Sequence, residues 1–591
     1  MPEYSPEPQI TVLDAGGQYC HLIARKVREL GVYAEVRPSD TPAAELRARK
    51  GILISGGPSS VYEPGSPTVS PGIFHAGMPV LGICYGLQLM AHLMGGAVRR
   101  GDKGEYGFAI LERSAAAPLF DGIPPGPQQV WMSHRDAVIG LPPGFEVLGR
   151  TDTCPVAAMA DVARSLYGVQ FHPEVVHTRH GREILENFVL RICGCQTDWD
   201  PKCRIPLVTR RIQEAAGPRN VFFFVSGGVD SSVAFILCVR ALGAERVRGI
   251  YVDTGLMREG ETDFVRRTFC QLAPGAVRIE PAESRFLAAL AGVRDPERKR
   301  VVIGEEFVRV QQEIIESGQF LEGDWILGQG TIYPDTIESG GTSNAAVIKT
   351  HHNRVAGIQQ LIQAGRIVEP LSSFYKDEVR EIGEELGLPS ELLHRHPFPG
   401  PGLAIRCLCS ETAAPVRRGE DGWLLPVRSV GVQGDSRSYA PVLALDRAPE
   451  PALFEEATGL INRIAGINRV VALVGSRAPL ASLEVVDSSL TPERLARLRR
   501  ADAVVRRLSH ARGFDRRVWQ FPVILVPLGT PERPDSVVLR PVDSVDGMTA
   551  RDVPMDPALL REMTRELLDL EGVAAVLYDL THKPPGTIEW E

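Results

Sequence analysis

The chain has 591 residues, of which 44% are hydrophobic and 23% are charged, and its formal net charge is −8. A chain of this length is too long for one hydrophobic core, so we expect about three or four domains. The negative charge argues against a nucleic-acid groove, which needs clustered lysine and arginine. No apolar run is long enough to span a membrane, and the first residues lack a signal-peptide pattern. The ten irregularly spaced cysteines suit a reducing cytosol, so we expect a cytoplasmic protein with no membrane or nucleic-acid partner.

The first region, about residues 9–195, alternates short apolar runs with helix-compatible segments. Residues 10–13, 51–54 and 80–83 are predicted strands, and the alternation is typical of a doubly wound α/β sheet. A polar stretch interrupted by prolines, residues 194–206, is predicted to be a linker to the next region.

Cys84 lies between the predicted strand 80–83 and a helix predicted to begin near Leu87. Gly82 and Gly86 flank it, and small residues on both sides permit the tight strand-to-helix turn that exposes a nucleophile. The N-terminus of the helix also favours the thiolate over the thiol. Most lone buried cysteines are structural, so a catalytic role for this one requires partners elsewhere in the chain.

Two such partners follow an apolar run, residues 166–171, which ends at His172. Glu174 comes two residues later, and in an extended chain this spacing places both side chains on one side of the backbone. The glutamate can then orient the imidazole and stabilise it when protonated. The pattern therefore predicts a catalytic triad of Cys84, His172 and Glu174; without the glycine elbow, a surface His-Pro-Glu turn would be the better interpretation.

A second glycine-rich segment, residues 226–232 (Ser-Gly-Gly-Val-Asp-Ser-Ser), joins a predicted strand, 221–225, to a predicted helix, 232–242. Its two glycines let the backbone approach an anion, and the N–H groups that open the helix point toward it. The lysine of a kinase-type phosphate loop is missing. An ordinary glycine turn is the alternative, but the length of the match and its flanks favour a phosphate loop. The segment resembles the pyrophosphatase loop of ATP-dependent amidating and thiolating enzymes, which adenylate a substrate and release pyrophosphate.

Two further regions follow this loop. A second α/β domain is predicted over residues 206–402, and a third domain, residues 403–591, contains an internal duplication divided at about residue 500. Each half reads strand, strand, helix, strand: 425–432, 441–445, 451–465 and 469–474, then 521–528, 536–542, 556–570 and 573–578. Each β-β-α-β unit is predicted to pack its helix on one face of a small sheet.

The N-terminal region resembles the class I glutamine amidotransferases in four motifs: residues 13–19, 55–58, 80–86 and 168–174. By that resemblance the domain has a flavodoxin-like doubly wound sheet, Cys84 attacks the glutamine carboxamide to form a thioester, and His172 transfers protons while ammonia is released. The resemblance also implies an oxyanion hole and a glutamine pocket, made by Gly57, Tyr85, Gln88, Ser133 and His134.

Essentially the whole chain, from about residue 10 to residue 591, resembles the GMP synthase family. The motifs that carry this resemblance are residues 328–335, 349–353, 374–380, 396–403 and 583–591. It implies that XMP, ATP, glutamine and water give GMP, AMP, pyrophosphate and glutamate, with adenylation of the xanthine O2 before ammonia displaces AMP from C2. It also implies a parallel sheet with helices on both faces around the loop, and a C-terminal α+β domain with repeated β-β-α-β units.

The same resemblance assigns residues to the two nucleotides, although a surface salt bridge is the ordinary alternative for each charged residue taken singly. The implied ATP contacts are Ser226, Gly227, Gly228, Val229, Asp230, Ser231, Ser232, Asp253, Lys349 and Lys376. The implied XMP contacts are Arg300, Pro401, Gly402, Gln520, Lys583, Thr587, Ile588 and Glu589. Mg²⁺ is expected with ATP, held by Asp230 directly or through water.

Three other functions would each require sequence features different from those present. A tRNA thiolase should show a reactive cysteine pair near its loop and a basic surface, and an NAD synthetase usually obtains ammonia from a nitrilase-type domain. A nucleotide-binding regulator would be favoured if Cys84, His172 or Asp230 were replaced, and all three are present. The duplicated unit resembles the longer form of the family, best known from eukaryotes, which leaves open both a homodimer through the C-terminal domain and a monomer.

Overall fold

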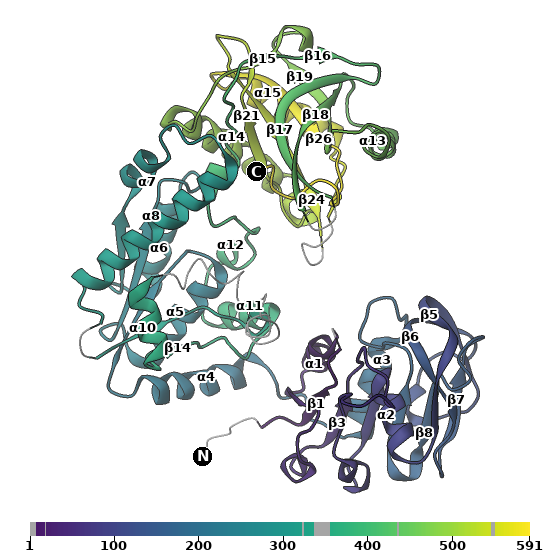
Figure 1. Ribbon diagram of the computed structural model, residues 1–591. Coiled ribbons are helices and arrows are strands. Elements are labelled where there is room, and N and C mark those ends of the chain that lie inside the picture. The colour runs from purple at the N-terminus through teal and green to yellow at the C-terminus, as the bar shows by residue number, and fades with distance from the viewer. Residues whose placement is uncertain (1–6, 18, 322–323, 336–354, 434–435, 545–549) are drawn as a thin grey trace. The chain divides into compact units, whose positions relative to one another are not determined.

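The computed structural model of the chain describes residues 7–17, 19–321, 324–335, 355–433, 436–544 and 550–591. It divides into two compact units, Met1–Val208 and Thr209–Glu591 (Figure 1). Among the described residues, no helix is both long and apolar enough to cross a bilayer. The finer domain bounds expected within the second unit stay a prediction.

The first unit is built on a nine-stranded sheet with the order β2-β1-β3-β4-β9-β8-β7-β5-β6. Strands β2, β1, β3, β4 and β9 pair in parallel, and the remaining strands pair antiparallel. Their bounds are β1 Ile10–Asp14, β2 Ala34–Pro38, β3 Gly51–Ile54, β4 Val80–Ile83, β5 Ala97–Arg113, β6 Gln128–Gly140, β7 Glu146–Arg150, β8 Ala158–Asp161 and β9 Leu166–Val169. The strands predicted at residues 51–54 and 80–83 are confirmed with the same bounds.

Helices cover both faces of the parallel part of this sheet. The helices are α1 (Cys20–Glu29), α2 (Tyr85–Leu93) and α3 (Gly181–Glu186). Leu53 belongs to an apolar cluster with α1 and α3, whereas Ile52 belongs to a second cluster with α2. Alternate residues of one strand thus enter different cores, because successive side chains point to opposite faces. The doubly wound sheet is confirmed.

The connection between the units is more ordered than the sequence predicts. Trp199 stacks on Tyr33, with ring centroids 4.0 Å apart and an interplanar angle of 4°. Helix α4 (Pro201–Ala216) then begins and includes Pro206, so the segment predicted as a linker, residues 194–206, is helical from Pro201 onward. Proline suits the first helical position, since the N–H it lacks would have no intrahelical partner there.

The second unit begins with a five-stranded parallel sheet of order β12-β11-β10-β13-β14. Its strands are β10 Asn220–Phe224, β11 Val247–Asp253, β12 Val277–Pro281, β13 Trp325–Gly328 and β14 Ile367–Val368. Its helices are α5 Val229–Leu242, α6 Glu261–Leu272, α7 Glu283–Leu290, α8 Pro296–Ser317, α10 Ala356–Gln363, α11 Lys376–Glu385 and α12 Ser390–Leu393. Strand order reverses between β10 and β13, and ligands in open α/β sheets bind at such a switch point.

The rest of the second unit holds a seven-stranded sheet of order β16-β17-β18-β19-β26-β23-β21. Its strands are β16 Arg417–Arg418, β17 Trp423–Gln433, β18 Ser436–Leu445, β19 Arg469–Ser476, β21 Val523–Val526, β23 Asp535–Leu539 and β26 Val573–Asp579. The helices are α13 Pro451–Arg463, α14 Pro492–Ala511 and α15 Pro557–Leu568. The repeated units predicted from the sequence are present as β17-β18-α13-β19 and β21-β23-α15-β26.

The two repeats share one sheet because their last strands pair. β19 and β26 run antiparallel, with Val471 opposite Asp579. On one face, residues such as Leu443 join a core with α13, α14 and α15. On the other face, residues such as Val442 pack under a small sheet of β15 (Ala414–Pro415), β20 (Glu484–Val485) and β22 (Leu528–Gly529). A further two-stranded ribbon joins β24 (Val542–Asp543) to β25 (Arg551–Asp552).

Candidate functional site

Cys84 occupies a strained turn between β4 and α2. Its φ is 53° and its ψ is −106°, a region that L-residues rarely adopt and that costs about 1–3 kcal/mol. A Cβ on Gly82 would lie 2.4 Å from the carbonyl oxygen of Gly86, and a Cβ on Gly86 would lie 2.4 Å from that of Ile54. Both flanking glycines are therefore required for the elbow that presents the thiol at the start of the helix.

His172 and Glu174 complete a buried chain of polar groups beside this thiol. The Nδ1 atom of His172 lies 2.7 Å from Oε1 of Glu174, whose second oxygen has no partner among the described residues. Burial lowers the pKa of His172, but hydrogen bonds and charges from Cys84 and Glu174 outweigh it and raise that pKa to about 10. The ring is thus held as an imidazolium between a thiol and a carboxylate, the arrangement that stabilises a thiolate.

The neighbouring groups around Cys84 come from several elements. Its Sγ lies 3.7 Å from the backbone oxygen of Ser133 and 3.5 Å from Nε2 of Gln170. Gln88 turns its amide inward, donating to the backbone oxygen of Asp136 at 2.8 Å and to Oε1 of Gln170 at 3.2 Å. Gln170 was missed as a site residue, although it lies inside the motif that contains His172.

The two residues expected at the oxyanion hole follow the paired strands β3 and β4. Tyr85 is the first residue of α2, where backbone N–H groups have no intrahelical acceptor. Gly57 follows β3, and a Cβ there would lie 2.4 Å from the backbone oxygen of Ala15 and 3.4 Å from the Tyr85 ring. The Nε2 atom of His134, which is expected in the glutamine pocket, lies 3.2 Å from Oε2 of Glu105.

The pyrophosphatase-like loop follows β10 and leads into α5. Gly227 has a φ of 74°, and the hydroxyls of Ser226 and Ser231 lie 3.0 Å apart. The N–H of Gly228 bonds to Oγ of Ser226 at 3.2 Å, and Ser231 donates to the Gly228 carbonyl at 3.2 Å. Val229 to Ser232 form the first turn of α5, whose N–H groups and dipole favour an anion.

Lys376 and Asp230 meet at this loop. The Nζ atom lies 2.5 Å and 2.6 Å from the two carboxylate oxygens, and the side chains are 39% and 30% exposed. Asp253 ends β11 and accepts a hydrogen bond from the Gly255 N–H at 3.1 Å. Lys349 lies outside the described residues.

Arg395 also contacts the loop, and the sequence did not point to it as a site residue. It donates to the backbone oxygen of Gly227 at 2.8 Å and pairs with Glu261 at 2.5 Å. Its side chain is only 15% exposed. The signal available was its position directly before the 396–403 motif.

Of the residues expected to bind XMP, Gln520 and Glu589 are brought together. Nε2 of Gln520 lies 3.4 Å from a Glu589 oxygen and donates to the Pro397 carbonyl at 2.9 Å. Glu589 also makes a bidentate pair with buried Arg406, at 2.6 Å and 2.8 Å. Because a carboxylate has about four lone-pair sites, this pairing orients Glu589 and leaves acceptor capacity.

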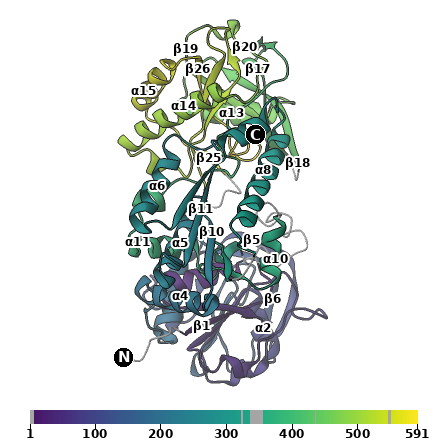
Figure 2. The same cartoon turned by 90° about the vertical axis from the view of Figure 1, so that its left-hand side faces the viewer.

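Arg300 lies on α8 and donates to the backbone oxygen of Glu591, so it contacts the C-terminal segment. Next to it, fully buried Lys299 binds the Glu591 carboxylate at 2.7 Å. Figure 2, like Figure 1, shows the C-terminus beside the start of α8.

A Cβ on Gly402 (φ 65°) would lie 2.3 Å from the Leu256 carbonyl oxygen, so the turn at Gly402 tolerates no side chain.

The other residues expected to contact XMP are Lys583, Thr587 and Ile588 in the C-terminal segment, and Pro401. Lys583 exchanges backbone hydrogen bonds with Ala550 at 2.8 Å and 3.2 Å. The hydroxyl of Thr587 donates to the backbone oxygen of Val430 at 3.1 Å, and the backbone oxygen of Ile588 accepts from Arg540 at 3.0 Å. Pro401 precedes the short helix that contains Gly402.

Three known families match separate parts of the chain. Residues 11–192 match the family described as glutamine amidotransferase class-I, and residues 204–272 match NAD synthase. Residues 508–590 match the GMP synthase C terminal domain.

Individual relatives extend over nearly the entire chain. A probable GMP synthase [glutamine-hydrolyzing] of Leptospira interrogans is 42% identical over 99% of both chains. The GMP synthase of Thermobifida fusca is 40% identical over 98% of both, and that of Thermomicrobium roseum is 46% identical over 80% of this chain and 95% of its own. The chain described here therefore belongs to the family of glutamine-hydrolysing GMP synthases.

Proposed function

We propose that this chain makes GMP: XMP, ATP, glutamine and water are converted to GMP, AMP, pyrophosphate and glutamate. The observation that carries the proposal is the presence, in one chain, of the Cys84–His172–Glu174 arrangement and of the 226–232 loop with Lys376. The first releases ammonia from an amide, and the second binds a polyphosphate. The two reactions are coupled because the ammonia released in the first displaces AMP from the carbon that the second activates.

In the glutaminase half-reaction, the Cys84 thiolate attacks the carboxamide carbon of glutamine. His172 then gives a proton to the leaving nitrogen, which departs as ammonia, and afterwards takes a proton from the water that cleaves the thioester. Glu174, buried and bonded to Nδ1, keeps Nε2 aimed at the thiol and stabilises the imidazolium. The backbone N–H groups of Gly57 and Tyr85 are proposed to bind the oxyanion.

In the synthetase half-reaction, the xanthine O2 of XMP attacks the α-phosphate of ATP and pyrophosphate leaves. The loop N–H groups and Lys376 are proposed to bind the phosphates and hold the departing charge. Asp230 fits a magnesium ligand, since it offers partly exposed carboxylate oxygens at the loop, and Mg²⁺ would neutralise phosphate charge there. Ammonia then attacks C2, and AMP departs with the O2 oxygen.

The XMP pocket is proposed to lie at the C-terminal segment. Glu589 would accept purine N–H groups, Gln520 would bond to the base beside it, and Lys583 would pair with the 5′-phosphate. Support comes from the 3.4 Å contact between Gln520 and Glu589 and from the bidentate Arg406 pair that orients Glu589.

We further propose a cytoplasmic enzyme that is monomeric. The two β-β-α-β units already pair with each other through β19 and β26, so the contact that the family resemblance assigns to a homodimer is available within one chain. Sedimentation equilibrium of the full chain tests this: one chain mass is expected, and a stable two-chain mass would support the homodimer instead.

The acceptor is tested by supplying the chain with ATP, Mg²⁺ and ammonium together with XMP, IMP or UMP. AMP and pyrophosphate are expected in equal amounts with XMP and not with the other two nucleotides. Equal turnover with IMP would overturn the assignment of the acceptor.

A further inference from the structure

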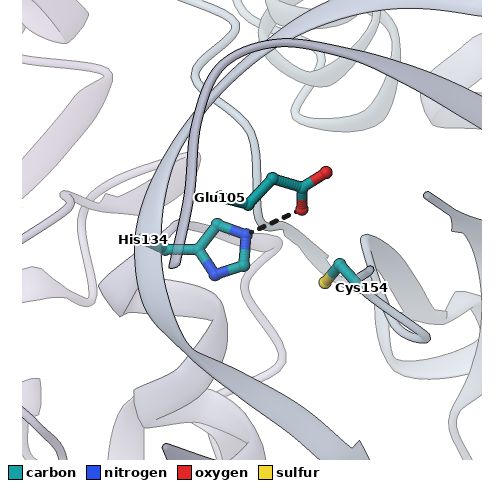
Figure 3. Close-up of side chains that lie close together, drawn as sticks. All are labelled: Glu105, His134 and Cys154. Atoms are coloured by element: carbon teal, nitrogen blue, oxygen red, sulfur yellow. Dashed lines mark hydrogen bonds and ion pairs between the residues drawn. The ribbon is translucent and has the colours of Figure 1, made fainter. Parts of the chain in front are cut away.

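Three side chains of metal-ligating type converge in the first unit, outside the triad. Glu105 comes from β5, His134 from the facing position on β6, and Cys154 from the segment between β7 and β8 (Figure 3). One ligand atom from each, a carboxylate oxygen, an imidazole nitrogen and a thiol sulfur, lies within 4.8 Å of the other two. Carboxylate, imidazole and thiolate together form a donor set typical of Zn²⁺.

The orientation of the His134 ring is fixed by its other nitrogen. Nδ1 lies 2.9 Å from the backbone oxygen of Asp136, which can only accept, so Nδ1 carries the proton. Nε2 then faces Glu105 Oε2 at 3.2 Å. Nε2 and the carboxylate oxygen are therefore close enough together to be ligands of one metal ion. Metal-binding histidines are oriented in this way, by a hydrogen bond from the other ring nitrogen.

Thr151 holds Glu105 and Cys154 in place through hydrogen bonds. Its hydroxyl donates to Glu105 Oε1 at 2.9 Å, and the N–H of Cys154 bonds to the same hydroxyl oxygen at 3.1 Å. Cys154 has no exposed surface, whereas the Glu105 side chain is 16% exposed and gives a route from solvent. A metal ion binds the thiolate form of cysteine, so binding at Cys154 would displace the thiol proton.

We propose that Glu105, His134 and Cys154 bind a thiophilic divalent cation, with Zn²⁺ as the best match. Three protein ligands leave one coordination position for water. This site goes beyond the proposed synthesis of GMP, which does not use Cys154.

Metal binding at this site is expected to affect Cys84 through β6, the strand that carries His134. The preceding residue, Ser133, places its backbone oxygen 3.7 Å from Cys84 Sγ. The backbone oxygen of Asp136, which orients His134, also accepts the hydrogen bond from Gln88. A shift of His134 onto a metal ion therefore moves groups that line the thiol, and we expect Zn²⁺ to slow glutamine hydrolysis. This second statement rests on the proposed glutaminase.

The binding test uses full chains that all carry Cys84→Ala, because Cys84 and His172 could themselves hold Zn²⁺. Zn²⁺ affinity is measured by competition with a chromophoric chelator, and Co²⁺ absorption reports thiolate ligation. One equivalent is expected in Cys84→Ala, with affinity at least tenfold lower after Cys154→Ser. Cys238→Ser is the matched control, since Cys238 is equally buried but lies on α5. No binding by Cys84→Ala, or equal affinity with and without Cys154, would overturn the site; circular dichroism verifies that each variant is folded.

The activity test uses chains with Cys84 intact and compares each variant with its own metal-free rate. Zn²⁺ is expected to inhibit glutamine hydrolysis in the parent, with the half-inhibitory concentration raised at least tenfold by Cys154→Ser. Ammonium-driven synthesis should be insensitive at those concentrations. Metal binding that leaves glutaminase unchanged would overturn the inhibitory role. A chain with no metal-free glutaminase would overturn the proposed function instead, while the Cys84→Ala titration would still decide the metal site.

Discussion

Lys376 is bonded to both carboxylate oxygens of Asp230, which ties the first residue of α11 to the phosphate-binding loop at the start of α5. Both residues are proposed to serve the polyphosphate, the lysine directly and the aspartate through a cation. When a nucleotide binds, Lys376 and Asp230 must therefore replace their contact with each other by contacts with the phosphates and the cation. The pair places the lysine at the loop before any nucleotide binds, which reduces the entropy lost on binding.

Replacing Asp230 with asparagine should disable the synthetase half-reaction. The amide keeps the shape but loses the charge that binds Lys376 and would hold Mg²⁺, so we expect XMP-dependent pyrophosphate release to fall about 10²- to 10³-fold, with glutamine or with ammonium. A coupled pyrophosphate assay measures this. Asp263→Asn is the control, because Asp263 pairs with Arg266 at the surface of α6. A loss confined to the glutamine-driven reaction would contradict the role of Asp230.

Arg395 is predicted to position the loop. In Arg395→Lys, one ammonium cannot bond to both the Gly227 carbonyl and Glu261 in the geometry of the guanidinium, so the loop should shift. We expect kcat for ammonium-driven synthesis to fall about tenfold or more, since small displacements of reacting groups are costly. Arg248→Lys removes a similar contact, to the Gly275 carbonyl, at the surface, and should leave the rate unchanged. Identical kcat in both variants would show that Arg395 does not position the loop.

The pH dependence of glutamine hydrolysis should report the pair of His172 and Glu174. Glu174 raises the pKa of His172, so Glu174→Gln should lower it and shift the alkaline limit of kcat/KM to lower pH. The rate at the optimum should fall about 10²- to 10⁴-fold, because the imidazole loses the group that orients it. An unchanged alkaline limit would mean that another group sets it.

The raised pKa of His172 also makes the free energy of unfolding depend on pH. Folding raises the pKa of His172 from 6.5 to about 10, so its contribution to the free energy of unfolding is complete below pH 6.5 and is lost as the pH rises toward 10. In Glu174→Gln this loss should still begin near pH 6.5, the pKa of the unfolded chain, but it should be smaller and end at lower pH, which thermal unfolding across that range would measure.

Asp579 is predicted to be the most sensitive charge in the C-terminal sheet. It is fully buried and pairs with Arg469 at 2.9 Å and Arg540 at 2.7 Å, so Asp579→Asn leaves two arginines without their counter-charge. We expect the free energy of unfolding to fall by about 3–5 kcal/mol. Asp569→Asn, which breaks a surface pair with Arg477, should change it by about 0–1 kcal/mol. Urea unfolding of the full chain compares the two, and equal effects would contradict the account.

Local features of the fold were predictable because they rest on neighbouring residues. The strands at 51–54 and 80–83 are apolar runs that end in glycine turns, and the elbow at Cys84 requires glycines at fixed positions beside it. The two β-β-α-β units repeat a pattern of strand and helix periods, and that pattern was enough to find them.

Long-range contacts were not predictable in the same way. Lys299 and Glu591 are far apart in the sequence, and neither is unusual until the fold buries them together. The convergence of Glu105, His134 and Cys154 depends on the register of β5 with β6, which a single sequence does not specify. Arg395 precedes a recognised motif, but its contact with Gly227 depends on how the two segments pack.

We propose that one chain frees ammonia at a thiolate and adds it to a carbon activated by transfer of AMP. The most direct test of this proposal is Cys84→Ala assayed with XMP, ATP and Mg²⁺, once with glutamine and once with ammonium. We expect no GMP from glutamine, and GMP, AMP and pyrophosphate in equal amounts from ammonium. Loss of synthesis with both nitrogen donors, or formation of ADP and orthophosphate, would contradict the proposal.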